Sequence, residues 1–228
     1  MTAREAILAR IRSARAGSGR QARADEPGAA YRIAGSLGGD ARLALLGERL
    51  EEYGVRVGRC APEEVAGTVA SVLRARRAAR VVVPAGVPAA WRPAGVTWLT
   101  EASGAQGGER LDLARLAVVD GVLTGCAVAI AETGTLALDA GDTQGRRALT
   151  LVPDYHLCVV LADQVVETVP EGVRRLEPAV REGRPITLVS GPSATSDIEL
   201  SRVAGVHGPR ILDVILVGGG PEGSRAGG

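Results

Sequence analysis

The first part of the chain alternates between helical and extended hydrophobic patterns. In residues 3–15, Ile7, Leu8 and Ile11 recur at helical spacing among charged residues, which predicts an amphipathic helix. Residues 16–39 are rich in Gly, Ala and Arg, so residues 1–39 are expected to form this helix and a flexible linker. Asp40 can cap a second helix that ends at Gly54. The face predicted for it consists of Leu43, Leu46, Leu50 and Tyr53.

Strand and helix patterns continue to alternate from residue 55 onward. Residues 55–57 predict a short strand, and Pro62 suits the first position of a helix. A stripe along that helix is formed by Val65, Val69 and Val72. The continuous apolar run at residues 80–84 is typical of a buried parallel strand. This order predicts an α/β fold with an open, mostly parallel sheet flanked by helices.

Closely spaced short strands are predicted in the middle of the chain, where Gly, Asp and Pro separate short apolar runs. These runs are residues 117–119, 121–131, 133–138, 148–152 and 156–161. The gaps between the last of them are too short for helices, so they predict a small antiparallel β extension of the parallel sheet.

The last third returns to alternating helices and strands. Thr168 and Glu171 form a capping-box pattern, and Val173, Leu176 and Val180 are expected on the apolar face of the helix that follows. Two apolar runs, residues 186–189 and 211–217, then predict buried strands. The main domain is thus expected to span residues 40–217, with a disordered tail at 218–228.

Composition narrows the possible functions. The 228 residues suffice for one sizeable domain, and a net charge of +1 does not indicate a nucleic-acid or membrane surface. The chain has no Lys, which excludes Schiff-base chemistry. Its start does not resemble a signal peptide and no apolar run approaches about 18 residues, so a cytoplasmic protein without membrane insertion is expected. Cys60, Cys126 and Cys158 lie far apart, which predicts buried thiols and no metal site.

The first cluster with possible chemistry is residues 131–135. Glu132 follows an apolar run and can act as a general base, a nucleophile or a ligand-orienting carboxylate. Thr133, Gly134 and Thr135 supply hydroxyl and backbone N–H groups for an anion. Alternatively, Glu132 is a turn carboxylate that binds its own backbone.

Two histidines complete the candidate catalytic residues. His156 follows Asp154 at the start of a very apolar strand, where it can bind substrate, shuttle a proton or close a layer of the core. His207 lies between Gly205 and Gly208 in a tight turn.

A polar stretch at residues 190–200 separates the two last predicted strands. Candidate substrate-binding residues in it are Ser193, Thr195, Ser196, Asp197 and Glu199. Its hydroxyl groups can bind phosphate or carboxylate at a helix start, although the same residue types are ordinary helix caps. Since ligands bind at the carboxyl ends of parallel strands, the stretch is expected at that edge. The chain has no G-x-G-x-x-G, P-loop, G-x-S-x-G or H-E-x-x-H motif.

Taken in order, residues 129–135, 153–156, 191–199 and 205–209 resemble the lactate utilization protein C family, also called the LutC/YkgG or LUD-domain family. The resemblance implies a NagB/RpiA/CoA-transferase-like fold. It also implies a role in L-lactate oxidation to pyruvate alongside iron–sulfur partner proteins. This chain lacks the cysteine-rich extension of longer relatives, so no cofactor is expected on it and iron–sulfur clusters are expected on the partners.

Two hypotheses about function remain open from the sequence. In the first, the chain is an accessory, substrate-side subunit of the lactate system: backbone N–H groups near Gly134 and residues 193–195 hold a small carboxylate, and His156 or His207 handles a proton. In the second, it is a stand-alone enzyme or binding protein for a small anion, such as a phosphosugar, a CoA thioester or a folate, with Glu132 as nucleophile. Association with further copies of the chain is left open.

Overall fold

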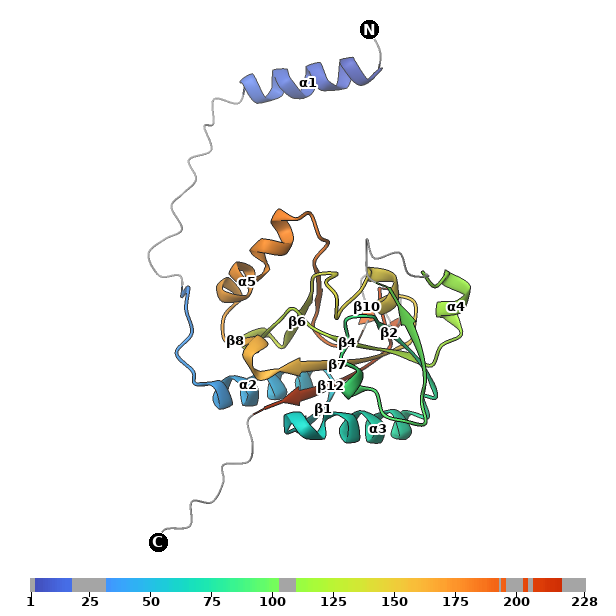
Figure 1. Ribbon diagram of the computed structural model, residues 1–228. Coiled ribbons are helices and arrows are strands. Elements are labelled where there is room, and N and C mark those ends of the chain that lie inside the picture. The colour runs from blue at the N-terminus through green and yellow to red at the C-terminus, as the bar shows by residue number, and fades with distance from the viewer. Residues whose placement is uncertain are drawn as a thin grey trace. The chain divides into compact units, whose positions relative to one another are not determined.

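A six-stranded, all-parallel sheet forms from the continuous apolar runs (Figure 1). The computed structural model describes residues 3–17, 32–102, 110–192, 194–195, 203–204 and 207–218. The sheet consists of β1 (Arg56–Cys60), β2 (Arg80–Pro84), β3 (Thr97–Glu101), β4 (Gly121–Gly125), β7 (Tyr155–Leu161) and β12 (Ile211–Val217). Their order is β1-β12-β7-β4-β2-β3, so the last strand of the chain lies between the first strand and β7.

Helices cover both faces of this sheet. Leu46 of α2 packs with Val214 of β12, and Val69 of α3 packs with Ile215. Successive strand residues point to opposite faces, so α2 and α3 lie on opposite sides. These helices are α2 (Gly39–Glu52), α3 (Val65–Arg76) and the short α4 (Leu113–Ala117). Single 3-10 turns are η1 (Pro62–Glu64), η2 (Ala89–Trp91), η3 (Ala131–Thr133), η4 (Arg147–Thr150) and η5 (Ala162–Gln164).

The predicted β extension is a second sheet on the α2 side of the first. Its strands are β5 (Val128–Ile130), β6 (Thr135–Leu138), β8 (Val165–Val166) and β9 (Thr187–Val189), in the order β8-β5-β6-β9. β5 and β6 form an antiparallel hairpin, and α5 (Val169–Arg181) packs on the sheet through Leu176. A separate antiparallel pair consists of β10 (Ala194–Thr195) and β11 (Val203–Ala204). The predicted fold class, a mostly parallel α/β sheet with a small β extension, is confirmed.

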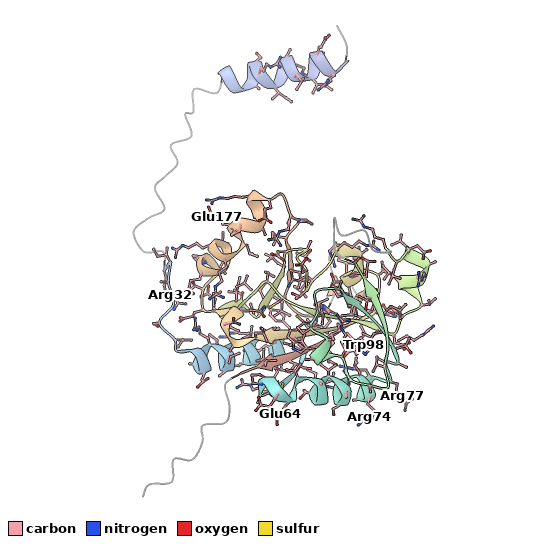
Figure 2. The ribbon with its side chains drawn as sticks, viewed as in Figure 1. Arg32, Glu64, Arg74, Arg77, Trp98 and Glu177 are labelled. Atoms are coloured by element: carbon pink, nitrogen blue, oxygen red, sulfur yellow. The ribbon has the colours of Figure 1, made fainter. Side chains whose placement is uncertain are left out.

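Three details of the predicted helices are wrong. Gly38, not Asp40, is the residue before α2, and no side chain caps that helix. Tyr53 lies beyond the helix end and is exposed. On α5, Leu176 is buried while Val173 and Val180 are about 60% exposed. Because α5 covers a small sheet, only a narrow stripe of it is buried, and its outer side carries charged residues such as Glu177 (Figure 2).

Two predicted strands are wrong, and a third is a strand that is not buried as predicted. Residues 117–119 are the end of α4 and a turn, and residues 148–152 fall in and after η4. Residues 187–189 form a strand, but it is an edge strand of the small sheet with Leu188 exposed to 62%. A short apolar run does not by itself distinguish a buried strand from a turn that packs on the core.

The first helix belongs to a separate unit of the chain. Residues 1–32 and 33–228 form two units. In the first, α1 (Ala3–Gly17) carries the predicted apolar residues Ile7, Leu8 and Ile11, all exposed. In the second lie all the clusters of buried hydrophobic residues of the described chain. Among the helices that the structure describes, none is long and apolar enough to cross a membrane.

Candidate functional site

A cleft of about 220 Å³ opens beside the amino ends of β7 and β12. The η4 turn forms one wall, and β9 with the residues after it forms another. The turn at residues 207–209 completes the rim. The residues with polar side chains that line the cleft are Arg147, Thr150, His156, Thr187, Ser190 and His207. We call it the Arg147 cleft.

The position of the cleft differs from the sequence prediction. The polar stretch was expected at the carboxyl ends of parallel strands, but β9 does not belong to the parallel sheet. His156 is the second residue of β7, and residues 207–209 directly precede β12. The cleft therefore lies at the amino edge of the main sheet, next to the edge strand of the small sheet.

Arg147 projects the main positive charge into the cleft. Its Nη1 donates to the backbone and hydroxyl oxygens of Thr150 at 2.8 and 3.1 Å, and its Nη2 donates to the carbonyl of His207 at 2.8 Å. Burial lowers the pKa of this guanidinium. Within the described part of the chain it contacts no carboxylate. Its neighbour Arg146, by contrast, binds both carboxylate oxygens of Glu101, at 2.8 and 2.9 Å.

A chain of hydroxyl groups leads from the first predicted cluster to the cleft. Thr133 Oγ1 lies 2.8 Å from Thr135 Oγ1, which lies 2.8 Å from Ser190 Oγ. Ser190 itself lines the cleft. Gly134, between the two threonines, has φ of 59° and packs against Arg49 of α2, where a Cβ atom would come within 2.9 Å of the Arg49 Cβ. The hydroxyl groups of Thr133 and Thr135 thus orient Ser190, and Gly134 lets the turn approach α2.

The two histidines occupy different positions at the cleft. The His156 side chain is almost fully buried at its floor, and its Nε2 lies 2.8 Å from Thr124 Oγ1 in β4. His207 is exposed at the rim, where its carbonyl holds Arg147. The structure therefore brings His156 and His207 to one cavity.

Glu132 belongs to η3, and its carboxylate lies against the first residue of α5. It is not among the residues that line the cleft. Its Oε1 accepts the backbone N–H of Val169, the first residue of that helix, at 2.9 Å. A carboxylate at a helix N-terminus satisfies an N–H group and interacts favourably with the helix dipole. This geometry gives Glu132 a structural role; a catalytic role for it stays a prediction.

Two further carboxylates surround the same helix start and hold an extended segment. Glu167 accepts the N–H groups of Ser36 and Leu37, both at 2.6 Å, and Glu171 accepts that of Gly35 at 3.0 Å. We call residues 35–37 the strap. The hydrogen bond from Gly35, followed by that from the Thr168 backbone, lowers the pKa of Glu171 to about 2. The capping box predicted from Thr168 and Glu171 is present.

Comparison with known proteins places this architecture in a family. The model of the LUD domain matches residues 43–217. The chain belongs to the LUD domain family. Lactate utilization protein C of Deinococcus radiodurans is 52% identical over 171 residues, which are 75% of this chain and 77% of that protein. Lactate utilization protein C of Shouchella clausii is 34% identical over 103 residues, 44% of each chain.

A solved structure has the same fold as this LUD domain. The crystal structure of a DUF162 family protein from Deinococcus radiodurans superimposes with a TM-score of 0.68 at 45% sequence identity. The matched region covers 80% of this chain and 100% of the Deinococcus radiodurans chain. The family resemblance seen in the sequence motifs is confirmed.

Five predicted binding residues of this LUD domain belong to the polar stretch at residues 190–200. Ser193, Ser196, Asp197 and Glu199 lie outside the described residues. Thr195 lies in β10, paired with Val203, and not at a helix start. Their proposed contacts with a ligand stay predictions. Among the residues that the structure does describe, no three His, Cys, Asp or Glu side chains are grouped so that they could hold a metal ion.

Arg147, Thr150 and Ser190 were not among the site residues predicted from the sequence. Residues 148–152 were predicted as a strand, which would have placed Arg147 at its end and not in a turn. One signal was present: Arg146 and Arg147 are adjacent cations directly before an apolar run. Only the structure shows that Glu101 neutralises Arg146 alone.

Proposed function

We propose that this LUD domain takes part in lactate utilization by binding a short-chain carboxylate in the Arg147 cleft. Two relatives with similar sequences, 52% and 34% identical over the matched residues, are named lactate utilization protein C. The cleft volume of about 220 Å³ suits a molecule of a few carbon atoms.

The environment of the Arg147 guanidinium is the main support for carboxylate binding in the cleft. A partly buried cation loses some of its hydration, which a nearby anion can offset, and this partial burial is the cause of the lowered pKa of Arg147. Its three hydrogen bonds in the described chain all go to neutral oxygen atoms. A guanidinium has five N–H groups arranged to bind a carboxylate with two parallel hydrogen bonds. A carboxylate in the cleft supplies the missing negative charge.

The other cleft residues suit the rest of such a ligand. The hydroxyl groups of Thr150 and Ser190 can donate to or accept from an oxygen on the carbon next to the carboxylate. His156 at the floor can hold or release a proton. In this arrangement Arg147 sets the position of the carboxylate, and the hydroxyl groups distinguish a 2-hydroxy or 2-oxo acid from a plain fatty acid.

The redox step is assigned to partner proteins in this proposal. Oxidation of lactate to pyruvate removes a hydride equivalent, which requires a flavin, a nicotinamide or a metal centre. We assign that centre to iron–sulfur proteins that act with this chain in the cytoplasm, and we give the chain the accessory, substrate-side role without a cofactor of its own.

Binding is tested by calorimetry with L-lactate and with pyruvate on the full chain. Arg147→Gln should weaken the binding of both by about 10- to 100-fold, because a charge-assisted pair is lost. Arg210→Gln is the matched control: this arginine lies one residue beyond the rim and is paired with Asp154. Equal affinity of the Arg147→Gln variant and the wild type, or no binding of either acid, would contradict the carboxylate site.

The partner assignment is tested by purifying the tagged chain from its host grown on lactate. Iron–sulfur proteins should be recovered with it, directly or after crosslinking, and the assembly should reduce a dye with lactate. The purified chain alone should not. Dye reduction by the chain alone would overturn the accessory role.

The alternative function, a stand-alone protein for a phosphosugar, a CoA thioester or a folate that uses Glu132, has a weaker basis. The hydrogen bond of Glu132 to α5 accounts for its position without a ligand. A thermal-shift screen of these compounds tests it, since a ligand of the folded state raises stability.

A further inference from the structure

A second hollow, of about 520 Å³, lies at the same edge of the main sheet as the Arg147 cleft. Apolar residues such as Leu73 line it together with Arg74 and Arg77. It is formed by the end of α3, by the residues directly before β2, and by residues 94–96, directly before β3. Because all strands of the main sheet are parallel, the hollow lies at its amino edge. We call it the Arg74 groove.

Three arginines come from the end of α3, and in the described part of the chain only one of them has an anionic partner. Arg76 binds both carboxylate oxygens of the buried Asp213, at 2.8 and 2.5 Å. Arg74 and Arg77 are exposed at the C-terminal end of α3, and neither contacts a carboxylate of the described chain (Figure 2). The negative end of the α3 dipole offsets part of their charge. An anion from outside the chain would offset the rest.

Exposed apolar side chains lie along the same edge. Val118 follows α4 just before β4, Leu151 follows η4, and Ile211 is the first residue of β12. In the sheet, β4 lies between β7 at the cleft and β2 at the groove, so about 10 Å separates these two strands. A standard protein interface covers about 800 Å² of each partner. One partner on this edge can therefore contact both openings.

The position of the cleft restricts where a redox partner can bind. In the proposed function the carboxylate lies in the Arg147 cleft, and another protein supplies the redox centre. That centre has to approach the ligand through the mouth of the cleft. The mouth opens beside the amino ends of β7 and β12. The Arg74 groove supplies two positive charges at the same edge, where they can orient an approaching acidic surface.

We propose that the amino edge of the main sheet, from the Arg74 groove to the Arg147 cleft, is the docking surface for an acidic patch of the redox partner. This inference rests on the proposed function for the role of that partner, and it adds the binding face and the charges that select it. Carboxylates of the partner pair with Arg74 and Arg77 at the groove. Its apolar side chains pack on Val118 and Ile211.

The test measures how much iron–sulfur protein is recovered with the tagged full chain from its host grown on lactate, after crosslinking. Arg74→Glu/Arg77→Glu sets like charges against the acidic patch, so the recovery should fall by about 10-fold or more. Arg174→Glu is the matched control and should recover as much as the wild type. Arg174 is an exposed arginine of α5 that contacts no carboxylate of the described chain. Recovery with the wild type should also fall as the salt concentration rises from about 0.05 M to about 0.5 M.

Two further measurements separate docking from folding and from carboxylate binding. Arg74→Gln/Arg77→Gln removes both charges and adds none, so it should reduce recovery by about 3-fold and leave the midpoint of thermal unfolding within about 2 °C of the wild type. The affinity for L-lactate, measured by calorimetry, should be the same in all these variants, because neither arginine lines the cleft. A wild type that binds no lactate would contradict the carboxylate site, whereas the recovery experiment would still decide the docking surface.

Three results would overturn the docking surface. The first is equal recovery of iron–sulfur proteins with the charge-reversed variant and with the wild type. The second is a wild type that recovers none, which would also remove the partner assignment but leave the cleft to be judged by calorimetry. The third is a dimer of the purified wild-type chain that Arg74→Glu/Arg77→Glu dissociates, because a second copy would then occupy the groove.

Discussion

Arg146 and Arg147 show how far the role of a residue depends on its partner. They are adjacent in sequence, yet Arg146 binds Glu101 and the carbonyl of Leu111, whereas Arg147 faces the cleft. The Glu101 carboxylate is almost fully buried and also accepts the N–H of Leu111 at 3.0 Å. Arg146 thus joins η4 to the end of β3. This contact fixes the position of the η4 backbone from which the Arg147 side chain extends.

Replacement of Glu101 should therefore destabilise the protein. Glu101→Gln leaves Arg146 without its anion, and we expect the free energy of unfolding to fall by about 2 kcal/mol, less than for a fully buried pair because the Arg146 side chain is 31% exposed. Urea denaturation measures this. Glu177→Gln, which breaks the exposed pair with Arg181, is the control and should change stability by less than about 0.5 kcal/mol.

A second residue-scale prediction concerns Glu132. Glu132→Gln should lower the free energy of unfolding by about 1 kcal/mol, because a charged acceptor at the start of α5 is lost. Lactate affinity should be unchanged, since Glu132 does not line the cleft. A variant of unaltered stability that no longer binds a small anion would favour the alternative function.

At the scale of elements, the strap and α5 stabilise each other. Gly35 passes so close to Glu167 that an added Cβ atom would lie 2.4 Å from the Glu167 Cβ. The strap N–H groups donate to one oxygen of Glu167 and one of Glu171, and these carboxylates lie at the positive end of α5.

This contact predicts a pH dependence. The pKa of Glu171 falls from its ordinary value of 4.5 to about 2 on folding, so its contribution to stability is complete above about pH 4.5 and is lost as the pH falls toward 2. Urea denaturation from pH 6 down to about 2 should show a steeper loss for the wild type than for Glu171→Gln. Parallel curves would contradict the predicted shift.

Helices and strands could be predicted from the sequence where a single local pattern, such as a continuous apolar run or a capping box, determined the structure. Residues 80–84, 156–161 and 211–217 are apolar runs long enough to be central strands, and all three are. Thr168 with Glu171 fixed the start of α5. Residues 148–152 are as long and as apolar as residues 80–84, and residues 186–189 are similar, yet neither forms a central strand, because their place depends on long-range packing that no local pattern contains. The cleft forms between these two segments, which is why its main residue, Arg147, was not predicted.

At the scale of the whole molecule, the unit from residue 33 onward should fold without the first. Its buried clusters are built from residues 43–217 alone. Deletion of residues 1–31 should leave the midpoint of thermal unfolding unchanged within about 1 °C, whereas deletion of residues 1–37 also removes the strap and should lower it by about 5 °C. Equal losses in the two deletions would contradict an independent second unit.

The order of strands also has a consequence for synthesis on the ribosome. Among the strands that the structure describes, β1 pairs only with β12, through residues 56–60 and 213–217, and β12 in turn separates β1 from β7. Until translation has passed residue 217, β1 lacks its β12 partner and β7 is paired on its β4 side alone, so the growing chain exposes the edge of each strand that faces β12. Such edges favour association between chains. Nascent copies of this protein should therefore be most prone to associate with one another before residues 211–217 have been synthesised.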